Sequence, residues 1–97
     1  MRDAGLLLVA VVEMVPDSVE AGAQYEDEVL ALLPRHGGTL ERRLAGGGTE
    51  VQVISFATRA GYDAFMVDPD RLAIRARYGD TAPTARVLEV TEVPVAT

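Results

Sequence analysis

The sequence contains neither cysteine nor lysine, and each absence excludes a kind of chemistry. Without cysteine the chain has no thiol nucleophile, no disulfide and no thiolate metal ligand. Without lysine it has no amine for a Schiff base or a lysine general base, and its nine basic residues are all arginine. Thiol enzymes and lysine-dependent enzymes are therefore excluded.

Positive charge and metal ligands are also scarce. The net charge is −6, whereas nucleic acids and anionic membrane surfaces bind clustered cations, so we expect neither partner. His36 is the only histidine, and one histidine with scattered carboxylates does not make a metal site. The run Gly46–Gly48 precedes a predicted strand, which is typical of a hairpin turn and not of a phosphate-binding loop. We expect no metal and no cofactor.

Long apolar runs are missing as well. The apolar run near the N-terminus is Leu6–Val12, which is far shorter than the roughly 20 residues of a membrane-spanning helix. Asp3 and Glu13 flank it, only Arg2 precedes it as a basic residue, and no cleavage site follows closely. These features argue against a signal peptide, so we expect a strand here and a cytoplasmic protein.

The remaining pattern is that of one small domain over residues 1–97. Hydrophobic periodicity and turn residues predict strands and helices in alternation. We expect strands at Leu6–Met14, Thr39–Ala45, Val51–Ala57 and Arg86–Val95, and helices at Ser18–His36, Thr58–Val67 and Asp70–Tyr78. Asp17 and Ser18 can cap the first helix, Thr58 can cap the second, and Asp68 with Pro69 can restart it. The order predicts a ferredoxin-like α+β fold: a four-stranded antiparallel sheet with the helices on one face.

The second face of this sheet is predicted to be apolar too, because the first and third strands carry large apolar residues at both parities. The composition agrees, since 48% apolar residues is high for so short a chain. A large apolar face rarely stays exposed, and the usual cover is a second copy in a two-fold dimer. We therefore expect a homodimer through the sheet face, with a ligand cavity in the space between the two sheets.

Several short features also match a known superfamily. They are the apolar first strand, His36–Gly38 at the end of the first helix, the Gly46–Gly48 turn, Phe56–Thr58 leading into an aromatic helix with Tyr62, and the closing strand Arg86–Val95. In these features the chain resembles the dimeric α/β-barrel superfamily, particularly a bacterial branch of unknown function. The second helix departs from that pattern, with Arg59–Tyr62 where acidic and tryptophan residues are usual.

The resemblance implies the ferredoxin-like fold and a dimer, but it does not decide the chemistry. The wider superfamily includes cofactor-independent quinone-forming monooxygenases, chlorite dismutase-like haem proteins, muconolactone isomerases and polyketide cyclases. Because one fold hosts all of these activities, function has to be argued from the site.

His36 is the candidate catalytic residue. It follows Leu32 of the inward helical stripe by one turn, so its imidazole could reach the cavity mouth and act as a general base near neutral pH. In the alternative interpretation it is only a cation at a helix end. If His36 is the base, His36→Ala is expected to abolish turnover without unfolding the protein.

Arg42, Arg43 and Tyr62 are the candidate ligand-binding residues. The two arginines are adjacent on a predicted strand and so point to opposite faces. One of them could bind a carboxylate or a phenolate, or it could simply pair with Glu41 or Glu50. Tyr62 is the tyrosine expected at a pocket.

Other charged residues are expected to be solvated. Glu26, Asp27 and Glu28 form a charge run on the first helix. Arg71 and Arg75 share one face of the last helix, where we expect pairing with Asp68 and Asp70; the alternative is an anion site. The leading hypothesis is a homodimer that binds a small organic molecule, aromatic or acidic, between sheet and helices, as a cofactor-free monooxygenase, isomerase or cyclase. The alternative is a non-catalytic dimerisation or ligand-sensing module.

Overall fold

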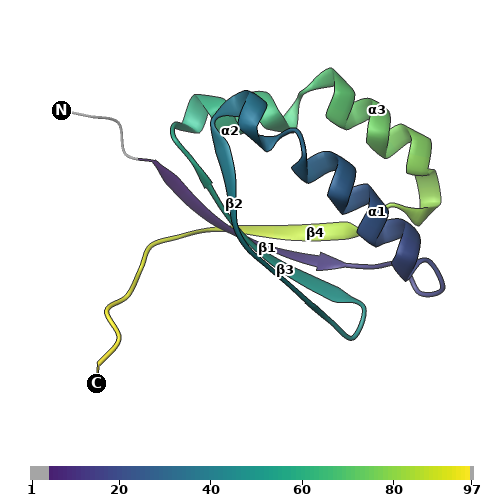
Figure 1. The fold of residues 1–97 in the computed structure, drawn as a ribbon, viewed down its shortest axis with the longest axis horizontal. Coiled ribbons are helices and arrows are strands. Elements are labelled where there is room, and N and C mark those ends of the chain that lie inside the picture. The colour runs from purple at the N-terminus through teal and green to yellow at the C-terminus, as the bar shows by residue number, and fades with distance from the viewer. Residues whose placement is uncertain (1–4, 97) are drawn as a thin grey trace.

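The computed structural model describes residues 5–96, and it confirms the predicted order of strands and helices (Figure 1). The elements are β1 (Leu6–Glu13), α1 (Val19–Leu30), the short 3-10 helix η1 (Leu33–His36), β2 (Gly38–Gly46), β3 (Thr49–Phe56), α2 (Arg59–Met66), α3 (Pro69–Tyr78), the 3-10 turn η2 (Gly79–Thr81) and β4 (Thr84–Val90). The four strands form one sheet in the order β2-β3-β1-β4, and all neighbours are antiparallel. This is the ferredoxin-like arrangement, with the helices on one face of the sheet (Figure 1).

Two predicted boundaries are wrong for identifiable reasons. The last strand ends at Val90 and not at Val95, because Val90 pairs with Leu7 near the start of β1 and the backbone beyond it has no neighbouring strand. The first helix ends at Leu30. A 3-10 turn with Pro34 near its start then replaces the last predicted turn, since proline cannot donate the backbone hydrogen bond that an α-helix needs.

The caps of the second half of the chain are confirmed, whereas those of the first helix are not. Thr58 Oγ1 accepts a hydrogen bond from the Gly61 amide at 3.0 Å. Asp68 Oδ1 accepts one from the Asp70 amide at 2.8 Å. Ser18 occupies the cap position of α1 without a side-chain hydrogen bond. The chain before α1 is therefore shaped by a turn, in which Asp17 adopts a positive φ of 68°.

The two faces of the sheet differ in burial. On β1, the side chains of Leu6, Leu8, Ala10 and Val12 are buried beneath the helices, while the alternate positions are only half-buried. The register places apolar side chains of all four strands on this second, open face: Leu7, Val9, Val11, Leu44, Val51, Val53, Leu88 and Val90. The open face is therefore apolar, as the strand pattern predicted, and no helix covers it (Figure 1).

A β-bulge in β2 decides which way its two arginines point. Leu40 pairs with Ile54 and Arg42 with Val53, so Glu41 is an extra residue in the ladder. The bulge places Arg42 on the open face. Arg43, opposite Gln52, lies on the helix face.

Candidate functional site

A cavity of about 420 Å³ lies between the helix face of the sheet and the helices. This volume is within the range of roughly 300–1,000 Å³ that is usual for small-molecule sites. Its walls are mainly apolar and come from β1, β3, α1 and α2: Leu8, Ala10, Val12, Val29, Leu30, Ile54, Phe56, Phe65 and Met66. Thr84, Ala85 and Val87 of β4 complete it, and since these residues are exposed the cavity opens at the β4 edge.

A polar end interrupts the apolar walls. Glu26 and Tyr25 of α1, Gln52 of β3, and Arg71 and Arg75 of α3 all line the cavity. Glu26 is only 6% exposed and Gln52 only 2% exposed. Since charged groups are rarely so deeply buried without a partner, this end of the cavity is the candidate site.

Glu26 belongs to a chain of polar contacts that runs from the cavity to the surface. Gln52 Nε2 donates to Glu26 Oε1 at 2.8 Å and to Glu50 Oε1 at 3.0 Å. Arg43 holds Glu50 with two hydrogen bonds, of 2.8 and 2.9 Å, and also reaches Asp27 on α1. We call Glu26, Gln52, Glu50, Arg43 and Arg71 the Glu26 cluster.

The two carboxyl groups of this cluster differ in acidity. Burial raises the pKa of Glu26 above its usual value, and the Glu50 charge adds to this effect, while the hydrogen bond from Gln52 and the Arg43 and Arg71 charges oppose it without cancelling it. Burial also acts against ionisation of Glu50, but the hydrogen bonds from Arg43 and Gln52 outweigh it and keep the pKa of Glu50 low. A pair whose acidities are driven apart in this way is typical of acid–base sites.

The two arginines at the polar end are held differently. Arg75 Nη1 reaches Tyr25 Oη at 3.4 Å and the Pro83 carbonyl at 3.2 Å. Arg71 Nη1 donates to the Met66 carbonyl at 3.3 Å, and its guanidinium lies 5.2 Å from the centre of the Phe65 ring. Both side chains line the cavity. Arg75 is exposed, as predicted for a solvated face, whereas Arg71 is half-buried and departs from that prediction.

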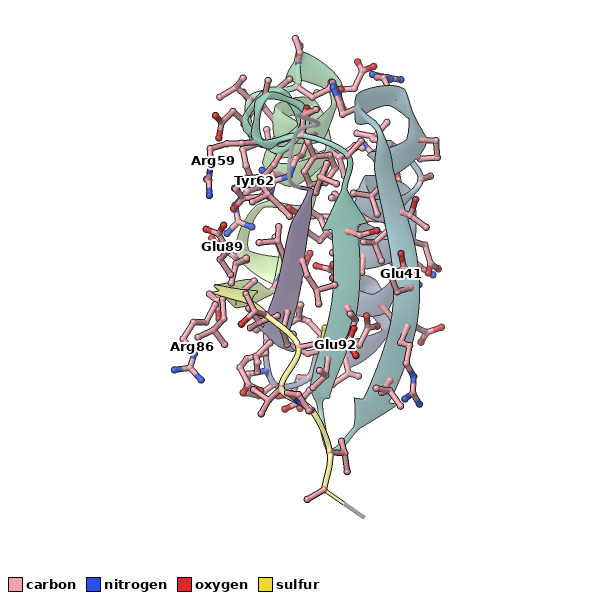
Figure 2. The ribbon with its side chains drawn as sticks, turned by 90° about the vertical axis from the view of Figure 1, so that its left-hand side faces the viewer. Glu41, Arg59, Tyr62, Arg86, Glu89 and Glu92 are labelled. Carbon is pink, nitrogen blue, oxygen red and sulfur yellow. The ribbon has the colours of Figure 1, made fainter. Side chains whose placement is uncertain are left out.

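The mouth of the cavity carries Tyr62 and an exposed ion pair. Tyr62 lines the cavity and packs edge-on against Phe56, with 5.4 Å between ring centres. Arg59 of α2 donates to both carboxylate oxygens of Glu89 on β4, at 2.7 and 2.8 Å. Figure 2 shows Arg59, Tyr62 and Glu89 together on one side of the molecule. The ion pair thus links helix and edge strand beside the opening.

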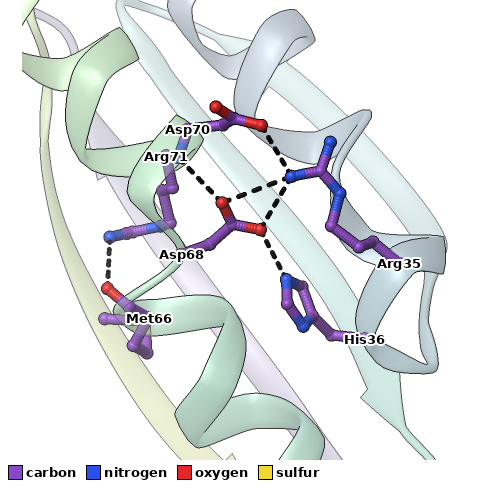
Figure 3. A network of polar contacts seen from close by, with 6 residues as sticks. All are labelled: Arg35, His36, Met66, Asp68, Asp70 and Arg71. Atoms are coloured by element: carbon purple, nitrogen blue, oxygen red, sulfur yellow. Dashed lines mark hydrogen bonds and ion pairs between the residues drawn. The ribbon is translucent and has the colours of Figure 1, made fainter.

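A second polar cluster lies outside the cavity, where η1 meets the start of α3 (Figure 3). We call Arg35, His36, Asp68 and Asp70 the Asp68 cluster. His36 Nε2 lies 2.6 Å from Asp68 Oδ2, and Arg35 Nη1 donates to Asp68 and to Asp70. The contact with His36, together with those from the Asp70 amide and Arg35, lowers the pKa of Asp68 to about 2.

The structure brings only part of the predicted set to the cavity. Tyr62 lines it, and Arg43 reaches it indirectly through Glu50 and Gln52. Arg42 points to the open face of the sheet. His36 is absent from the cavity lining and contacts Asp68, so its role as a base remains a prediction that this geometry does not favour.

Sequence reasoning missed Glu26 and Gln52, and it considered Arg71 only as the less favoured possibility of an anion site. Glu26 had a detectable signal, because it lies three residues before Val29 and four before Leu30, within the apolar stripe of α1. A charged residue inside an apolar stripe is expected to be buried, so this pattern favours a buried functional group at Glu26 over a member of a solvated charge run. Arg71 had the weaker signal of its i, i+4 spacing to Arg75, and no comparable signal marks Gln52, which reaches the cavity only through the packing of β3.

Metal and membrane features were searched over the part of the chain that the structure describes. Residues 5–96 contain no group of three or more histidine, cysteine, aspartate or glutamate side chains placed to hold a metal ion. No helix in the same range has the length and apolar character needed to cross a membrane.

Comparison with known proteins identifies the fold. No family model matches the sequence, and no curated protein matches it either. Among solved structures, a proposed antibiotic biosynthesis monooxygenase from Bacteroides thetaiotaomicron is similar at a TM-score of 0.75, with 14% identity over 96% of this chain and 94% of that one. SnoaB, a cofactor-independent oxygenase from Streptomyces nogalater, is similar at a TM-score of 0.62, with 15% identity over 94% and 95%.

A protein from Mycobacterium tuberculosis has a TM-score of 0.67, with 20% identity over 97% of this chain and 100% of that one. At such identities the likeness shows a shared fold. The chain therefore has the ferredoxin-like α+β fold of the antibiotic biosynthesis monooxygenase structures.

Proposed function

We propose that this protein is a homodimer that binds a small, largely apolar organic molecule with an acidic group, and that it acts on this molecule without a cofactor. The observation that carries the proposal is the cavity of about 420 Å³, which has apolar walls and one polar end. A planar molecule would bury its carbon skeleton against Leu8, Ile54 and Phe65. Its oxygen atoms would then lie near Glu26 and the arginines.

Oxygenation is the reaction we propose to test first. SnoaB, which shares the fold, is a cofactor-independent oxygenase. Such a reaction needs no cofactor when the substrate itself supplies the electrons: a CH2 group and O2 give a C=O group and water, with atoms and electrons balanced. The protein has to bind the substrate, favour its deprotonated form and exclude water, all of which a mostly apolar cavity with a carboxyl group can provide.

The homodimer is proposed from the open sheet face. Its apolar side chains come from all four strands, and Leu44 and Leu88 are 46% and 41% exposed in the single chain. Val9 lies in the centre of this face, on the central strand β1. We expect Val9→Asp to convert a dimer into a monomer in native mass spectrometry. Ala73→Asp on the exposed side of α3 is the control and should leave the dimer intact.

Ligand binding is tested by filling the cavity from its edge. Ala85 lines the cavity but is exposed on β4, so a larger side chain there can enter the opening without overpacking the core. Native mass spectrometry of fresh protein should show a dimer with retained extra mass, and Ala85→Phe should remove that mass. Ala73→Phe, outside the lining, should retain it. A bare dimer in all three proteins would contradict the proposed binding.

A non-catalytic ligand-sensing module is the second candidate, and one observation favours it. His36, the predicted base, is bound to Asp68 and lies outside the cavity lining. A dioxygen electrode with a panel of phenols and 1,3-diketones distinguishes the two candidates. Consumption that Ala85→Phe abolishes supports an oxygenase, whereas binding without consumption across the panel supports the sensor.

A further inference from the structure

Two groups at the polar end of the cavity, Glu26 and Arg71, are left with incomplete hydrogen bonding. They come from different helices, α1 and α3, and both line the cavity. Buried polar groups in native proteins normally find partners, so an incomplete pair at a cavity points to a ligand that completes it. The argument that follows rests on the proposed function, since it specifies what the same cavity binds.

The carboxyl group of Glu26 has one oxygen engaged and one available. Oε1 accepts the hydrogen bond from Gln52. Within residues 5–96, no side-chain or backbone donor contacts Oε2. The residue is nevertheless 94% buried, being only 6% exposed. This second oxygen can therefore accept a proton or a hydrogen bond from a molecule inside the cavity.

The guanidinium of Arg71 has one edge without partners. Its Nη1 is held by the Met66 carbonyl (Figure 3). The contact with the Phe65 ring restricts the plane of the group. Its Nε is buried, and in the described part of the chain neither Nε nor Nη2 donates to any acceptor. The Nε–Nη2 edge of a guanidinium is suited to receive an oxyanion.

The other cationic groups nearby are placed differently. Arg75 donates to Tyr25 and to the Pro83 carbonyl from Nη1 alone, but it is exposed, whereas Arg71 is half-buried and its Nε is buried without a partner. Arg43 is engaged by Glu50 and Asp27. Among the cavity-lining arginines, Arg71 is therefore the one that combines a buried, unpartnered nitrogen with a charge that acts on Glu26.

We propose that Glu26 and Arg71 form a proton-accepting site for a weakly acidic hydroxyl group, such as that of a phenol or an enol. In the step, the O–H bond of the ligand breaks and its electron pair stays on the ligand oxygen. The proton moves to Oε2 of Glu26, which becomes a neutral carboxyl group. The ligand oxyanion is then held by the free edge of Arg71. Charge and protons balance, and no further reactant is needed.

The surroundings favour this transfer. Burial and the nearby Glu50 charge raise the pKa of Glu26 and so strengthen it as a base, while the Arg43 and Arg71 charges limit the effect. Glu50 stays ionised because Arg43 holds it. After the transfer, the negative charge that Glu26 carried lies on the ligand, next to Arg71, while Glu50 keeps its own charge, paired with Arg43. The site thereby exchanges a buried carboxylate for a bound anion of delocalised charge.

The test uses 4-nitrophenol as the probe, because its anion absorbs visible light and its neutral form does not. The titration is carried out at a mildly acidic pH, where the free phenol is mostly neutral. We expect the wild-type dimer to bind the phenol and to generate the anion band without releasing a proton to the buffer. Glu26→Gln should bind the neutral phenol and lose the band.

Arg71→Gln removes the proposed anion partner and should weaken binding of the anionic form by about 10- to 100-fold, the range for a hydrogen bond to a charged group. Glu26→Asp keeps a carboxylate one methylene shorter and should restore part of the band that Glu26→Gln loses. Melting curves show that each variant is folded.

The outcomes separate this inference from the proposed function. If the wild type binds the phenol, Ala85→Phe prevents binding and yet the bound phenol stays neutral, the proton-accepting site is overturned while the cavity stands. An anion band equally strong in wild type and in folded Glu26→Gln also overturns it. Failure of the wild type to bind the phenol contradicts both proposals.

Discussion

The Asp68 cluster and the Glu26 cluster have a similar composition but differ in how completely they are bonded. Each contains a buried carboxyl group, with Asp68 3% exposed and Glu26 6% exposed. Each also joins segments that are distant in the sequence. In the Asp68 cluster, both carboxylate oxygens accept two contacts, from Arg35 and the Asp70 amide at Oδ1 and from Arg35 and His36 at Oδ2.

The Glu26 carboxyl, by contrast, receives one hydrogen bond and faces a cavity. The difference separates a cluster whose hydrogen bonding is complete within the fold from the cluster that we propose to bind a ligand. A carboxylate has about four acceptor sites, and Asp68 has used all of them on the protein itself. Glu26 keeps a free oxygen at a concave apolar surface. The pH behaviour should differ accordingly, because the pKa of Asp68 is lowered and that of Glu26 is raised.

Removing the Asp68 carboxylate should have the largest effect on stability. Asp68→Ala deletes the cap of α3 and leaves Arg35 and His36 without their shared partner. We expect the melting temperature to fall by roughly 5 °C or more, as for the loss of a cap in a small domain. Asp63→Ala on the exposed side of α2 is the matched control. Equal melting temperatures for Asp68→Ala and Asp63→Ala would contradict the view that the Asp68 cluster stabilises the fold.

Acid should weaken the Asp68 cluster selectively. Because the folded-state pKa of Asp68 is about 2 and its ordinary value is 3.8, its contribution to stability is present above the ordinary value. That contribution is lost as the pH falls from about 3.8 towards 2. We expect wild-type stability to decline more steeply over this window than that of Asp68→Asn. Parallel declines in denaturant titrations at several pH values would show that Asp68 is not responsible.

The same analysis predicts the opposite sign for Glu26. Its folded-state pKa is raised, so its contribution to stability is greatest below the ordinary value of 4.5 and is lost as the pH rises through the folded-state value. We expect Glu26→Gln, which keeps the hydrogen bond from Gln52, to melt about 2–5 °C higher than wild type at neutral pH. The gap should close as the pH is lowered. A destabilised Glu26→Gln at neutral pH would mean that the carboxylate is there for the fold.

The smallest effect is expected at the cavity mouth. Arg59 and Glu89 are 57% and 53% exposed, and exposed ion pairs add little to stability. Arg59→Gln should therefore change the melting temperature by less than about 2 °C. If Arg59→Gln instead lowers the melting temperature as much as Asp68→Ala does, burial does not determine how much a polar cluster contributes to the stability of this protein.

The fold could be predicted largely from the sequence because its signals are local. The continuous apolar run of β1, the Thr58 and Asp68 caps and the glycine turn before β3 each act over a few residues. The end of β4 could not be predicted in this way, since it depends on where β1 begins.

The site was harder to predict, because its members are far apart in the sequence. Glu26, Gln52 and Arg71 meet only after β3 and α3 have packed against α1. His36 was the natural candidate from residue type alone, yet a carboxylate 32 positions later in the chain engages it. Residue chemistry can be read from a sequence, whereas the number of partners that a residue has already found cannot.

The extra residue Glu41 in β2 has a consequence for how this sequence tolerates change. Along a strand, the side to which a residue points depends on whether its position is odd or even, and the bulge reverses that parity for everything after Leu40. Deleting this one residue would remove the bulge and leave Leu40, Arg42 and Arg43 paired with the same residues of β3, so Arg43 would still face the helices. Inserting one residue between Glu41 and Arg43 without a second bulge would instead turn Arg43 outward, and Glu50 would lose its cation. The cost of a length change in β2 therefore depends on whether the bulge can absorb it.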